Sequence, residues 1–301
     1  SYLEMLIWPM LGVGFTGNML ARGAASLGRI NEILNVEPEI VPVVDPPATL
    51  GASGGHTLEA RHLSYRYPGM EVDALSGVSF TLEAGSSLGI LGTTGSGKST
   101  LMWLLPRLLD PPEGTVLLGG RDIRTLDLGE LRSVFGIVSQ DTFLFSATIA
   151  ENIAYAAPEA DDATVREMAE ISTIARDLDL FPDGIATEVG EKGVSLSGGQ
   201  KQRIAISRAL AVNPEILLFD DALSAVDTES EEVILRRLEE ERAGKTNIIV
   251  SHRVSTLQFA DQILVLDRGK VIQQGTPEEL AKTEGLYRRI AALQSMERRV
   301  S

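Results

Sequence analysis

The nine residues from Gly92 to Thr100 (GTTGSGKST) constrain this chain more than any other stretch of its sequence. They fit the pattern G-x-x-x-x-G-K-[ST] and follow a short apolar run that is typical of a buried strand. The residues from Lys98 to Leu109 have a helix-like pattern. Glycines let the backbone N–H groups of such a turn point inward at close range, because no Cβ atoms stand in the way. The sequence therefore predicts a phosphate-binding loop between a strand and a helix.

Two side chains give this loop its expected chemistry. Lys98 is expected to reach the β- and γ-phosphates of a nucleotide, and the hydroxyl of Ser99 is expected to bind Mg²⁺. The helix that begins near Lys98 adds the positive end of its dipole. The alternative is a turn rich in Gly and Ser without a ligand. We expect the whole loop to bind nucleotide: Gly92, Thr93, Thr94, Gly95, Ser96, Gly97, Lys98, Ser99 and Thr100.

The composition of the chain excludes several other classes of protein. Its 301 residues are 44% hydrophobic, which is enough for one large globular domain or two. The net charge of -15, from 27 basic and 42 acidic side chains, argues against a nucleic-acid partner. The chain has no cysteine, so disulfides and thiolate metal sites are impossible. This absence fits a reducing cytoplasm.

An uncharged run from Met5 to Ala21 opens the chain. Its 17 residues fall short of the roughly 20 that cross a bilayer. A secretory signal would need a basic segment before the run, but Glu4 stands there and no basic residue precedes it. A buried soluble helix is one alternative. We favour the last part of a transmembrane helix from a longer polypeptide, because such helices tolerate Gly and Pro and because Arg22 and Arg29 would follow on the cytoplasmic side.

The rest of the chain divides by its hydrophobic patterns. Helical spacing continues to residue 34, and four prolines between residues 38 and 47 then indicate a linker over residues 37–56. Alternating apolar residues predict strands from residue 57 onward, with an irregularity at His62-Leu63. Helical patterns from about residue 141 to residue 205 predict an inserted helical subdomain. A basic helix with no assigned role is expected over residues 286–301.

Polar residues at strand ends could complete a nucleotide site. A hydrophobic strand ends in Asp220-Asp221, which suits one acid that holds Mg²⁺ and a second acid that positions the attacking water. Gln140 also follows a strand, where its carbonyl could ligate Mg²⁺ or orient water, although a lone Gln there is usually just solvated. His252 follows another strand and could contact a γ-phosphate, although a lone histidine is more often structural.

A second glycine-rich helix start lies about a hundred residues after the first, at LSGGQ, residues 196–200. Ser197, Gly198, Gly199 and Gln200 precede a helix that we expect to begin near Lys201, which makes a second anion-binding geometry. The two helix starts are too far apart in the chain to be assumed to meet on one nucleotide. Tyr67, at the end of its strand, could stack on adenine, although packing against the core is the more common use of such a tyrosine.

Taken together, these motifs resemble the nucleotide-binding domain of an ATP-binding cassette exporter. The resemblance implies an α/β fold over residues 57–285, with a RecA-like phosphate-loop core, an antiparallel β subdomain and an inserted α-helical subdomain at about 141–205. Residues 1–36 then resemble the end of the last transmembrane helix and its cytoplasmic extension. The motifs that carry the resemblance are Tyr67, residues 92–100, Gln140, LSGGQ at 196–200, ILLFDD at 216–221, SAVD at 224–227 and His252.

This resemblance also implies roles for single residues and for partners. In that family two domains dimerise head to tail, and each ATP lies between the phosphate loop of one domain and the LSGGQ of the other. Tyr67 would stack on adenine, whereas Ser197 and Gly199 would serve the partner's ATP. The residues implied for Mg²⁺ are Ser99, Gln140 and Asp220, and those implied for hydrolysis are Gln140, Asp221 and His252.

The implied surroundings are those of an exporter at the cell membrane, with this domain on the cytoplasmic face. Its expected partners are a transmembrane domain outside this sequence, the lipid membrane and a small hydrophobic or amphipathic substrate, but no nucleic acid. TEVGEKG at residues 187–193 resembles the loop that touches the membrane domain's coupling helices, with Lys192 where arginine is usual.

One departure from the family pattern concerns Asp221, where glutamate is usual. Asp is one methylene shorter, and a misplacement of about 1 Å can cost on the order of 100-fold in rate. We therefore hypothesise a degenerate site that holds ATP and hydrolyses it slowly, in a heterodimer whose other half carries Glu. Three alternatives stay open: Asp221 works normally, the chain is an ATP-gated regulatory module with little hydrolysis, or it is a soluble ATPase of the same superfamily.

Overall fold

The computed structural model describes residues 2–41, 46–51, 55–190 and 193–300. The chain divides into two compact units, residues 1–41 and residues 42–301. The first unit is built on one helix, α1 (Tyr2–Leu34), which contains Pro9. Large apolar side chains such as Trp8 and Phe15 are exposed on this helix. Among the helices of the described residues, none has both the length and the apolar character that crossing a membrane requires.

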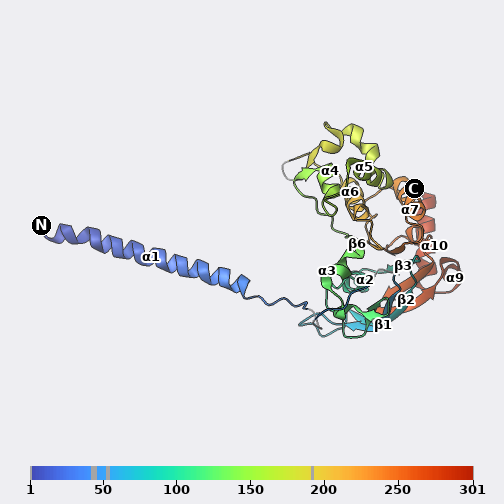
Figure 1. The fold of residues 1–301 in the computed structure, drawn as a ribbon. Coiled ribbons are helices and arrows are strands. Elements are labelled where there is room, and N and C mark those ends of the chain that lie inside the picture. Colours follow the sequence, from blue (N-terminus) through green and yellow to red (C-terminus); the bar gives the residue numbers. More distant parts are fainter. Residues whose placement is uncertain (1, 42–45, 52–54, 191–192, 301) are drawn as a thin grey trace. The chain divides into compact units, whose positions relative to one another are not determined.

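A six-stranded sheet forms the centre of the second unit (Figure 1). Strands β11, β3, β10, β9 and β6 are parallel neighbours in that order, and β12 pairs antiparallel with β11 at one edge. Parallel sheets are covered on both faces, so their strands are continuous apolar runs. The strands are β3 (Ser87–Gly92), β6 (Phe135–Val138), β9 (Ile216–Asp220), β10 (Thr246–Val250), β11 (Gln262–Asp267) and β12 (Lys270–Gly275).

Successive residues of these strands point to opposite faces and enter two separate apolar clusters. Leu218 belongs to one cluster, together with residues of α2 (Lys98–Leu104) and of the antiparallel sheet. Its neighbours Leu217 and Phe219 join the other cluster. The helices on that second face are α6 (Gly198–Ala211), α7 (Thr228–Glu241), α8 (Val254–Leu257), α9 (Pro277–Lys282) and α10 (Leu286–Val300).

A second sheet has the antiparallel order β2-β1-β4-β5. The pairing of β1 with β2 shifts register between Ala60 and Leu63, and His62 has a φ of 47°. This confirms the irregularity that the sequence predicts there. The elements of this part are β1 (Leu58–Tyr65), β2 (Leu75–Leu82), β4 (Val116–Leu118), β5 (Arg121–Asp122), η1 (Ile123–Thr125) and α3 (Leu128–Ser133).

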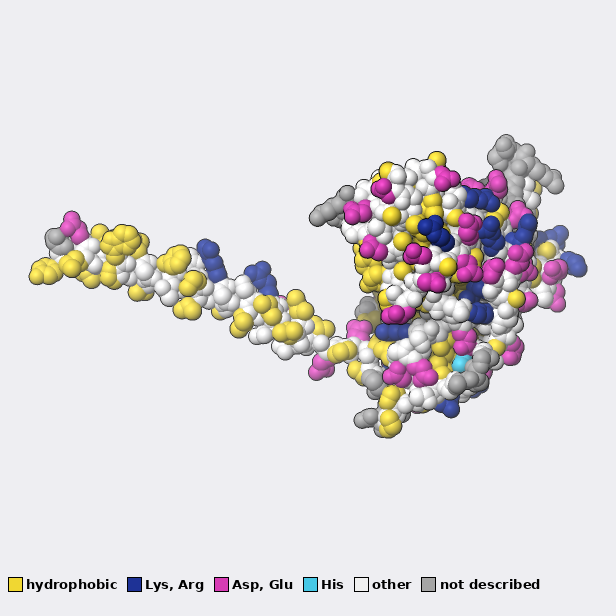
Figure 2. Space-filling model, turned by 45° about the horizontal axis from the view of Figure 1, so that its top comes forward, with side chains coloured by type: hydrophobic (Ala, Val, Ile, Leu, Met, Phe, Trp, Pro, Cys, Tyr) yellow, Lys and Arg dark blue, Asp and Glu magenta, His cyan; other side chains and the backbone are white. Residues whose placement is uncertain are grey.

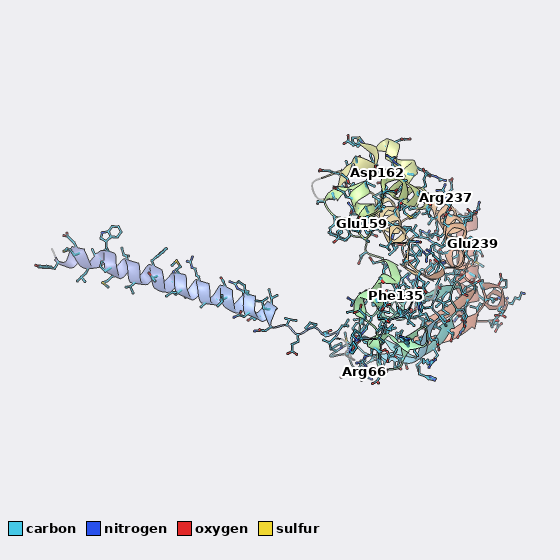
Figure 3. The ribbon with its side chains drawn as sticks, in the orientation of Figure 1. Arg66, Phe135, Glu159, Asp162, Arg237 and Glu239 are labelled. Atoms are coloured by element: carbon cyan, nitrogen blue, oxygen red, sulfur yellow. The ribbon has the colours of Figure 1, made fainter. Side chains whose placement is uncertain are left out.

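The inserted segment forms a helical subdomain with an apolar cluster of its own. Glu159 and Asp162 belong to this subdomain, and Arg66 lies at the opposite end of the unit (Figure 3). Side-chain caps start both of its α-helices, Thr148 with Glu151 in one case and Asp161 in the other. Its elements are β7 (Ala147–Thr148), α4 (Ile149–Ala154), α5 (Asp162–Ile171), η2 (Ile174–Leu180), η3 (Gly184–Ala186) and β8 (Glu188–Val189).

Two predicted helix boundaries were wrong. Helix α2 ends at Leu104, not Leu109, because Pro106 cannot donate a backbone hydrogen bond to continue it. Helix α6 begins at Gly198, three residues before Lys201, because Ser197 caps it. Part of the predicted linker is also docked on the domain, since the backbone N–H of Ala48 donates to the carbonyl of Thr125 at 2.8 Å.

Candidate nucleotide-binding site

Four neighbouring parallel strands bring the predicted site residues to one edge of the main sheet. The phosphate loop follows β3, His252 follows β10, Asp221 follows β9 and Gln140 follows β6. Strand pairing places Val250 opposite Ile90 and Asp220, so these carboxyl ends are level with one another. Ligands of open α/β sheets bind at the carboxyl ends of the strands. The fold therefore makes one site from segments far apart in the sequence.

The phosphate loop is closed so tightly that two of its positions require glycine. A Cβ at Gly92 would lie 2.5 Å from the carbonyl oxygen of Leu266 and 2.5 Å from the hydroxyl of Ser96. Gly97 has a φ of 99°, and a Cβ there would lie 2.6 Å from the carbonyl oxygen of Ala74. Between them, Thr93, Thr94 and Gly95 are exposed. The loop thus has a rigid base and an accessible tip.

Lys98 is buried inside this loop, with 7% of its surface exposed. Its ammonium group donates to the carbonyl oxygens of Gly92 at 2.8 Å and Thr93 at 2.9 Å. Burial lowers the pKa of Lys98, and the carboxylates of Asp220 and Asp221 oppose this shift. The ammonium group also donates to the hydroxyl of Ser96 at 3.5 Å. These partners within the loop are all neutral, so a phosphate is a suitable ligand for the buried cation.

Ser99 and Asp220 provide oxygen atoms side by side. The Ser99 hydroxyl lies close enough to the carboxylate of Asp220 to stabilise its charged form, and Asp220 is 6% exposed. Burial raises the pKa of Asp220, whereas Ser99, Lys98 and His252 counter this shift. Such hard oxygen ligands fit Mg²⁺. No three His, Cys, Asp or Glu side chains converge within the described ranges, so Mg²⁺ here would also need phosphate and water oxygens.

The three predicted hydrolysis residues lie around this pair. Asp221 has a φ of 50°, and its backbone N–H donates to the carbonyl of Val250 at 3.0 Å. Asp is one of the few residues that tolerate this left-handed conformation. Gln140 and His252 are exposed. Asp221 is partly exposed, so all three side chains can be reached by water at the sheet edge.

Tyr67 packs beside the start of α2. Its hydroxyl is 3.1 Å from that of Thr100, and its ring meets the ring of Tyr65 edge to face, with centroids 5.2 Å apart. Packing is therefore one function of Tyr67, and part of its side chain stays accessible. Stacking of Tyr67 on adenine stays a prediction.

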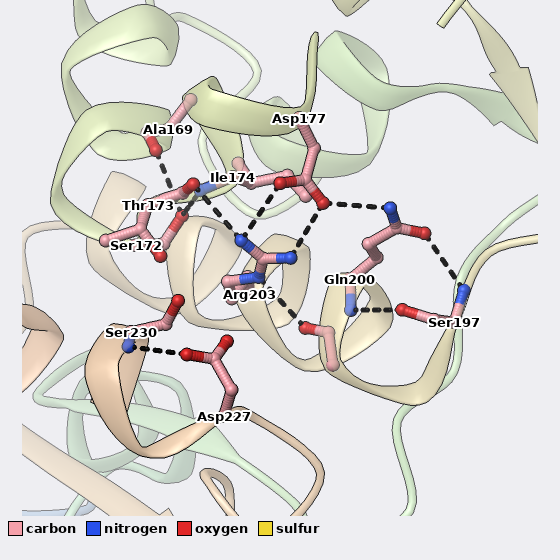
Figure 4. A network of polar contacts seen from close by, with 11 residues as sticks. Ala169, Ser172, Thr173, Ile174, Asp177, Ser197, Gln200, Arg203, Asp227 and Ser230 are labelled. Atoms are coloured by element: carbon pink, nitrogen blue, oxygen red, sulfur yellow. Dashed lines mark hydrogen bonds and ion pairs between the residues drawn. The ribbon is translucent and has the colours of Figure 1, made fainter. Parts of the chain in front are cut away.

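The LSGGQ segment is structurally complete without a ligand (Figure 4). The Ser197 hydroxyl accepts from the backbone N–H of Gln200 at 3.2 Å, and the Gln200 side chain accepts from the backbone N–H of Ser197 at 3.0 Å. The Gln200 amide also donates to Asp177 at 2.8 Å, and Arg203 pairs with the same carboxylate at 2.7 Å. In the part of the chain that the structure describes, no hydrogen bond or ion pair joins LSGGQ to the phosphate loop.

Sequence reasoning missed Asp177 and Arg203. Arg203 lies four residues after Gly199 on α6, which was a usable signal, because residues four apart share a helix face. Asp177 is 26 residues away from Arg203 and gives no local signal. In the predicted loop at residues 187–193, Glu191 and Lys192 lie outside the described residues.

Comparison with known proteins agrees with this geometry. Residues 75–224 match the family model described as ABC transporter. The chain is 45% identical over 289 residues to a probable multidrug resistance ABC transporter ATP-binding/permease protein of Bacillus subtilis, YheI, covering 95% of this chain and 48% of that protein. It is 42% identical to the multidrug resistance-like ATP-binding protein MdlA of Escherichia coli, covering 98% of this chain and 50% of that protein.

A solved structure agrees as well. The structure of a bacterial Atm1-family ABC exporter with ATP bound matches with a TM-score of 0.87 and 38% identity, covering 97% of this chain and 51% of that one. The chain thus spans about half the length of these relatives. The match confirms the predicted α/β fold. The chain therefore carries the nucleotide-binding domain of the ATP-binding cassette transporter family.

Proposed function

We propose that this chain binds and hydrolyses ATP as part of an exporter in the cell membrane, with its nucleotide-binding domain on the cytoplasmic face. The observation that carries the proposal is the grouping of the buried Lys98 and Asp220 with the half-buried Ser99, which a phosphate chain and Mg²⁺ would complete. The names of the relatives, which include multidrug resistance transporters and an exporter solved with ATP, support it.

Each part of the site then has a task. The backbone and side chains of residues 92–100 hold the phosphates, and Tyr67 stacks on adenine. Ser99 and Asp220, with the Gln140 carbonyl, hold Mg²⁺, which would neutralise charge on the phosphates. Asp221 positions the attacking water, and Gln140 and His252 contact the γ-phosphate side of the site.

The second helix start serves another subunit in this proposal. Ser197, Gly198, Gly199 and Gln200 lie at the exposed start of α6 and make no hydrogen bond to the phosphate loop within the described ranges. The Ser197 hydroxyl accepts a hydrogen bond from Gln200 and keeps its own proton for an external acceptor. Two domains arranged head to tail would bring such a donor to the partner's ATP and couple ATP binding to dimerisation.

The side chain at residue 221 makes this half of the exporter the slow one. Asp221 interacts electrostatically with Lys98 and Asp220, which supports a place for it beside the phosphates. Its carboxylate is one methylene shorter than that of the usual Glu. The partner is then a different chain with Glu at that position. The cargo is a small hydrophobic or amphipathic molecule bound by a transmembrane domain.

The substitution Asp221→Glu tests this assignment. We expect single-turnover hydrolysis at this site to rise by about 10- to 100-fold, with ATP affinity unchanged. Because the φ of 50° at this position suits Asp better than Glu, the melting temperature must be measured alongside. No rise in turnover by a folded variant would contradict the slow-site assignment.

A second candidate function is an ATP-gated regulatory module with little hydrolysis, which the short Asp221 side chain favours. ATP binding without single-turnover hydrolysis in both wild type and Asp221→Glu would support this candidate. A soluble ATPase acting on nucleic acid is less compatible with the acidic side chains spread over the face shown in Figure 2 and with the net charge of -15.

A further inference from the structure

The C-terminal helix α10 has a buried stripe that ends in a polar residue. Tyr287 is 2% exposed, and Ile290 packs on the same apolar cluster. Gln294 follows them at the spacing i, i+3, i+7, which places all three on one face of the helix. By contrast, Leu293 is 63% exposed. Gln294 therefore occupies an inward position where an apolar side chain would be expected to continue the stripe.

The side-chain amide of Gln294 forms hydrogen bonds with the backbone on both sides of Arg253, in the segment that carries His252. Its Nε2 donates to the carbonyl oxygen of His252 at 2.7 Å, and its Oε1 accepts from the backbone N–H of Val254 at 2.9 Å. These two backbone groups flank Arg253. A side-chain amide supplies both a donor and an acceptor, so it can make this pair of bonds as a neighbouring strand would.

The same segment is held from its other side by Arg253. The guanidinium of Arg253 pairs with the carboxylate of Glu231 on α7, which is 4% exposed, and donates to the carbonyl of Ser224. The backbone N–H of Arg253 donates to the hydroxyl of Ser251 at 3.0 Å. Side chains from α7 and α10 thus fix the segment from two directions.

His252 itself has an exposed side chain. The direction of its ring therefore depends on the backbone that carries it, and not on packing around the ring. Val250, two residues before His252, pairs with Asp220, so His252 lies at the same edge of the sheet as the nucleotide site. A shift of the 251–254 backbone would move this ring relative to Lys98 and Asp220.

We propose that Gln294 is a positioning residue that holds the His252 backbone and so makes helix α10 part of the nucleotide site. This inference rests on the proposed function, in which His252 contacts the γ-phosphate. It gives the basic C-terminal helix a task that neither the motifs nor the matched segment 75–224 assigns.

The test compares three substitutions in the full-length protein. Gln294→Met keeps the length of the side chain and removes both hydrogen bonds, whereas Gln294→Glu keeps the acceptor for Val254 and loses the donor to His252. Leu293→Ala is the control, one residue away on the exposed side of α10. Hydrogen exchange of the Val254 amide, ATP affinity and single-turnover hydrolysis are measured for each, with His252→Ala as the reference for loss of the ring.

We expect Gln294→Met to speed exchange at Val254 and to slow hydrolysis by roughly three- to tenfold, the size of one or two lost hydrogen bonds, with ATP affinity unchanged. Gln294→Glu should slow hydrolysis while Val254 stays protected, and it decides the question if Gln294→Met does not fold. In the double variant with His252→Ala, Gln294→Met should add no further loss, because it acts through that ring.

Two results would overturn the inference in different ways. If His252→Ala slows hydrolysis and neither Gln294 variant does, Gln294 is not a positioning residue and the proposed function stands. If His252→Ala leaves hydrolysis unchanged, the role of His252 in the proposed function is wrong and the inference fails with it.

Discussion

The two glycine-rich helix starts of this domain look alike in sequence but differ in structure. Helix α2 begins after Gly97, which is in the left-handed region and provides no side-chain cap, and Lys98 lies buried within the loop. Helix α6 begins after Ser197, which forms a complete capping box with Gln200. The start of α2 leaves a buried cation and uncapped backbone N–H groups for a ligand. At the start of α6, the side chains of Ser197 and Gln200 already accept hydrogen bonds from the backbone N–H groups. This difference supports the proposal that the first helix start binds the chain's own nucleotide and that LSGGQ acts on the nucleotide of a partner subunit.

The largest expected difference is in ATP affinity, between variants of the two lysines that follow these turns, Lys98 and Lys201. Lys98→Ala should weaken ATP binding by about 100-fold or more, because it removes the buried cation from the phosphate loop. Lys201, just after LSGGQ, is exposed, so Lys201→Ala should change the affinity less than about twofold. Titration calorimetry with ATP and Mg²⁺ measures both, and melting temperatures without nucleotide report the folding of each variant. Equal losses of ATP affinity in the two variants would contradict the difference between the two helix starts.

A smaller difference is expected in the free energy of unfolding, between variants of Gly97 and Gly198. Gly97→Ala should lower the free energy of unfolding by about 2 to 4 kcal/mol, because the position combines a φ of 99° with a clash against Ala74. At Gly198 a Cβ would lie 3.3 Å from the Cβ of Ala225 and the backbone is not strained, so Gly198→Ala should cost less than about 1 kcal/mol. Denaturant unfolding measures both values. A stable Gly97→Ala variant would show that the loop is less constrained than its geometry indicates.

The smallest effect concerns the cap of α6. Ser197→Ala should destabilise the domain by about 1 kcal/mol, because it removes the N-cap, whereas Ser197→Asp keeps a good cap and should cost less than about 0.5 kcal/mol. The aspartate would, however, repel a phosphate brought by another subunit. Ser197→Asp should therefore reduce ATP-dependent association, measured by size-exclusion chromatography with Mg²⁺-ATP, while stability is kept. Normal association of this variant would mean that Ser197 does not approach the partner's nucleotide.

Local sequence patterns are sufficient to predict much of the fold and the phosphate-loop part of the candidate site. The loop at residues 92–100, the strand end at Asp220 and the irregularity at His62 all follow from residues that are close in sequence. The helix boundaries failed where a single residue decides them, at Pro106 and at Ser197. Such capping and breaking effects act over one turn and are weak in a pattern averaged over a window.

The remaining contacts join residues far apart in the chain. Gln294 reaches His252 across 42 residues, and Arg203 reaches Asp177 across 26. These side chains are polar, so hydrophobic periodicity does not mark them, and the spacing of Arg203 from Gly199 marks its helix face but not its partner Asp177. Only the packing of α10 beside the sheet edge, and of α6 against the helical subdomain, brings them together, and this depends on the tertiary fold.

The central claim is that the phosphate loop and LSGGQ of this chain act on different nucleotides. Because the chain has no cysteine, a single Ser197→Cys substitution can be paired with one cysteine in the phosphate loop of the partner subunit. The account predicts disulfide cross-linking between the two subunits that requires Mg²⁺-ATP. This cross-linking is lost when Lys98→Ala is combined with the substitution of the corresponding lysine in the partner's phosphate loop. A fully active protein that forms no cross-link between subunits, and that joins Ser197→Cys to Thr94→Cys within one chain instead, would contradict it.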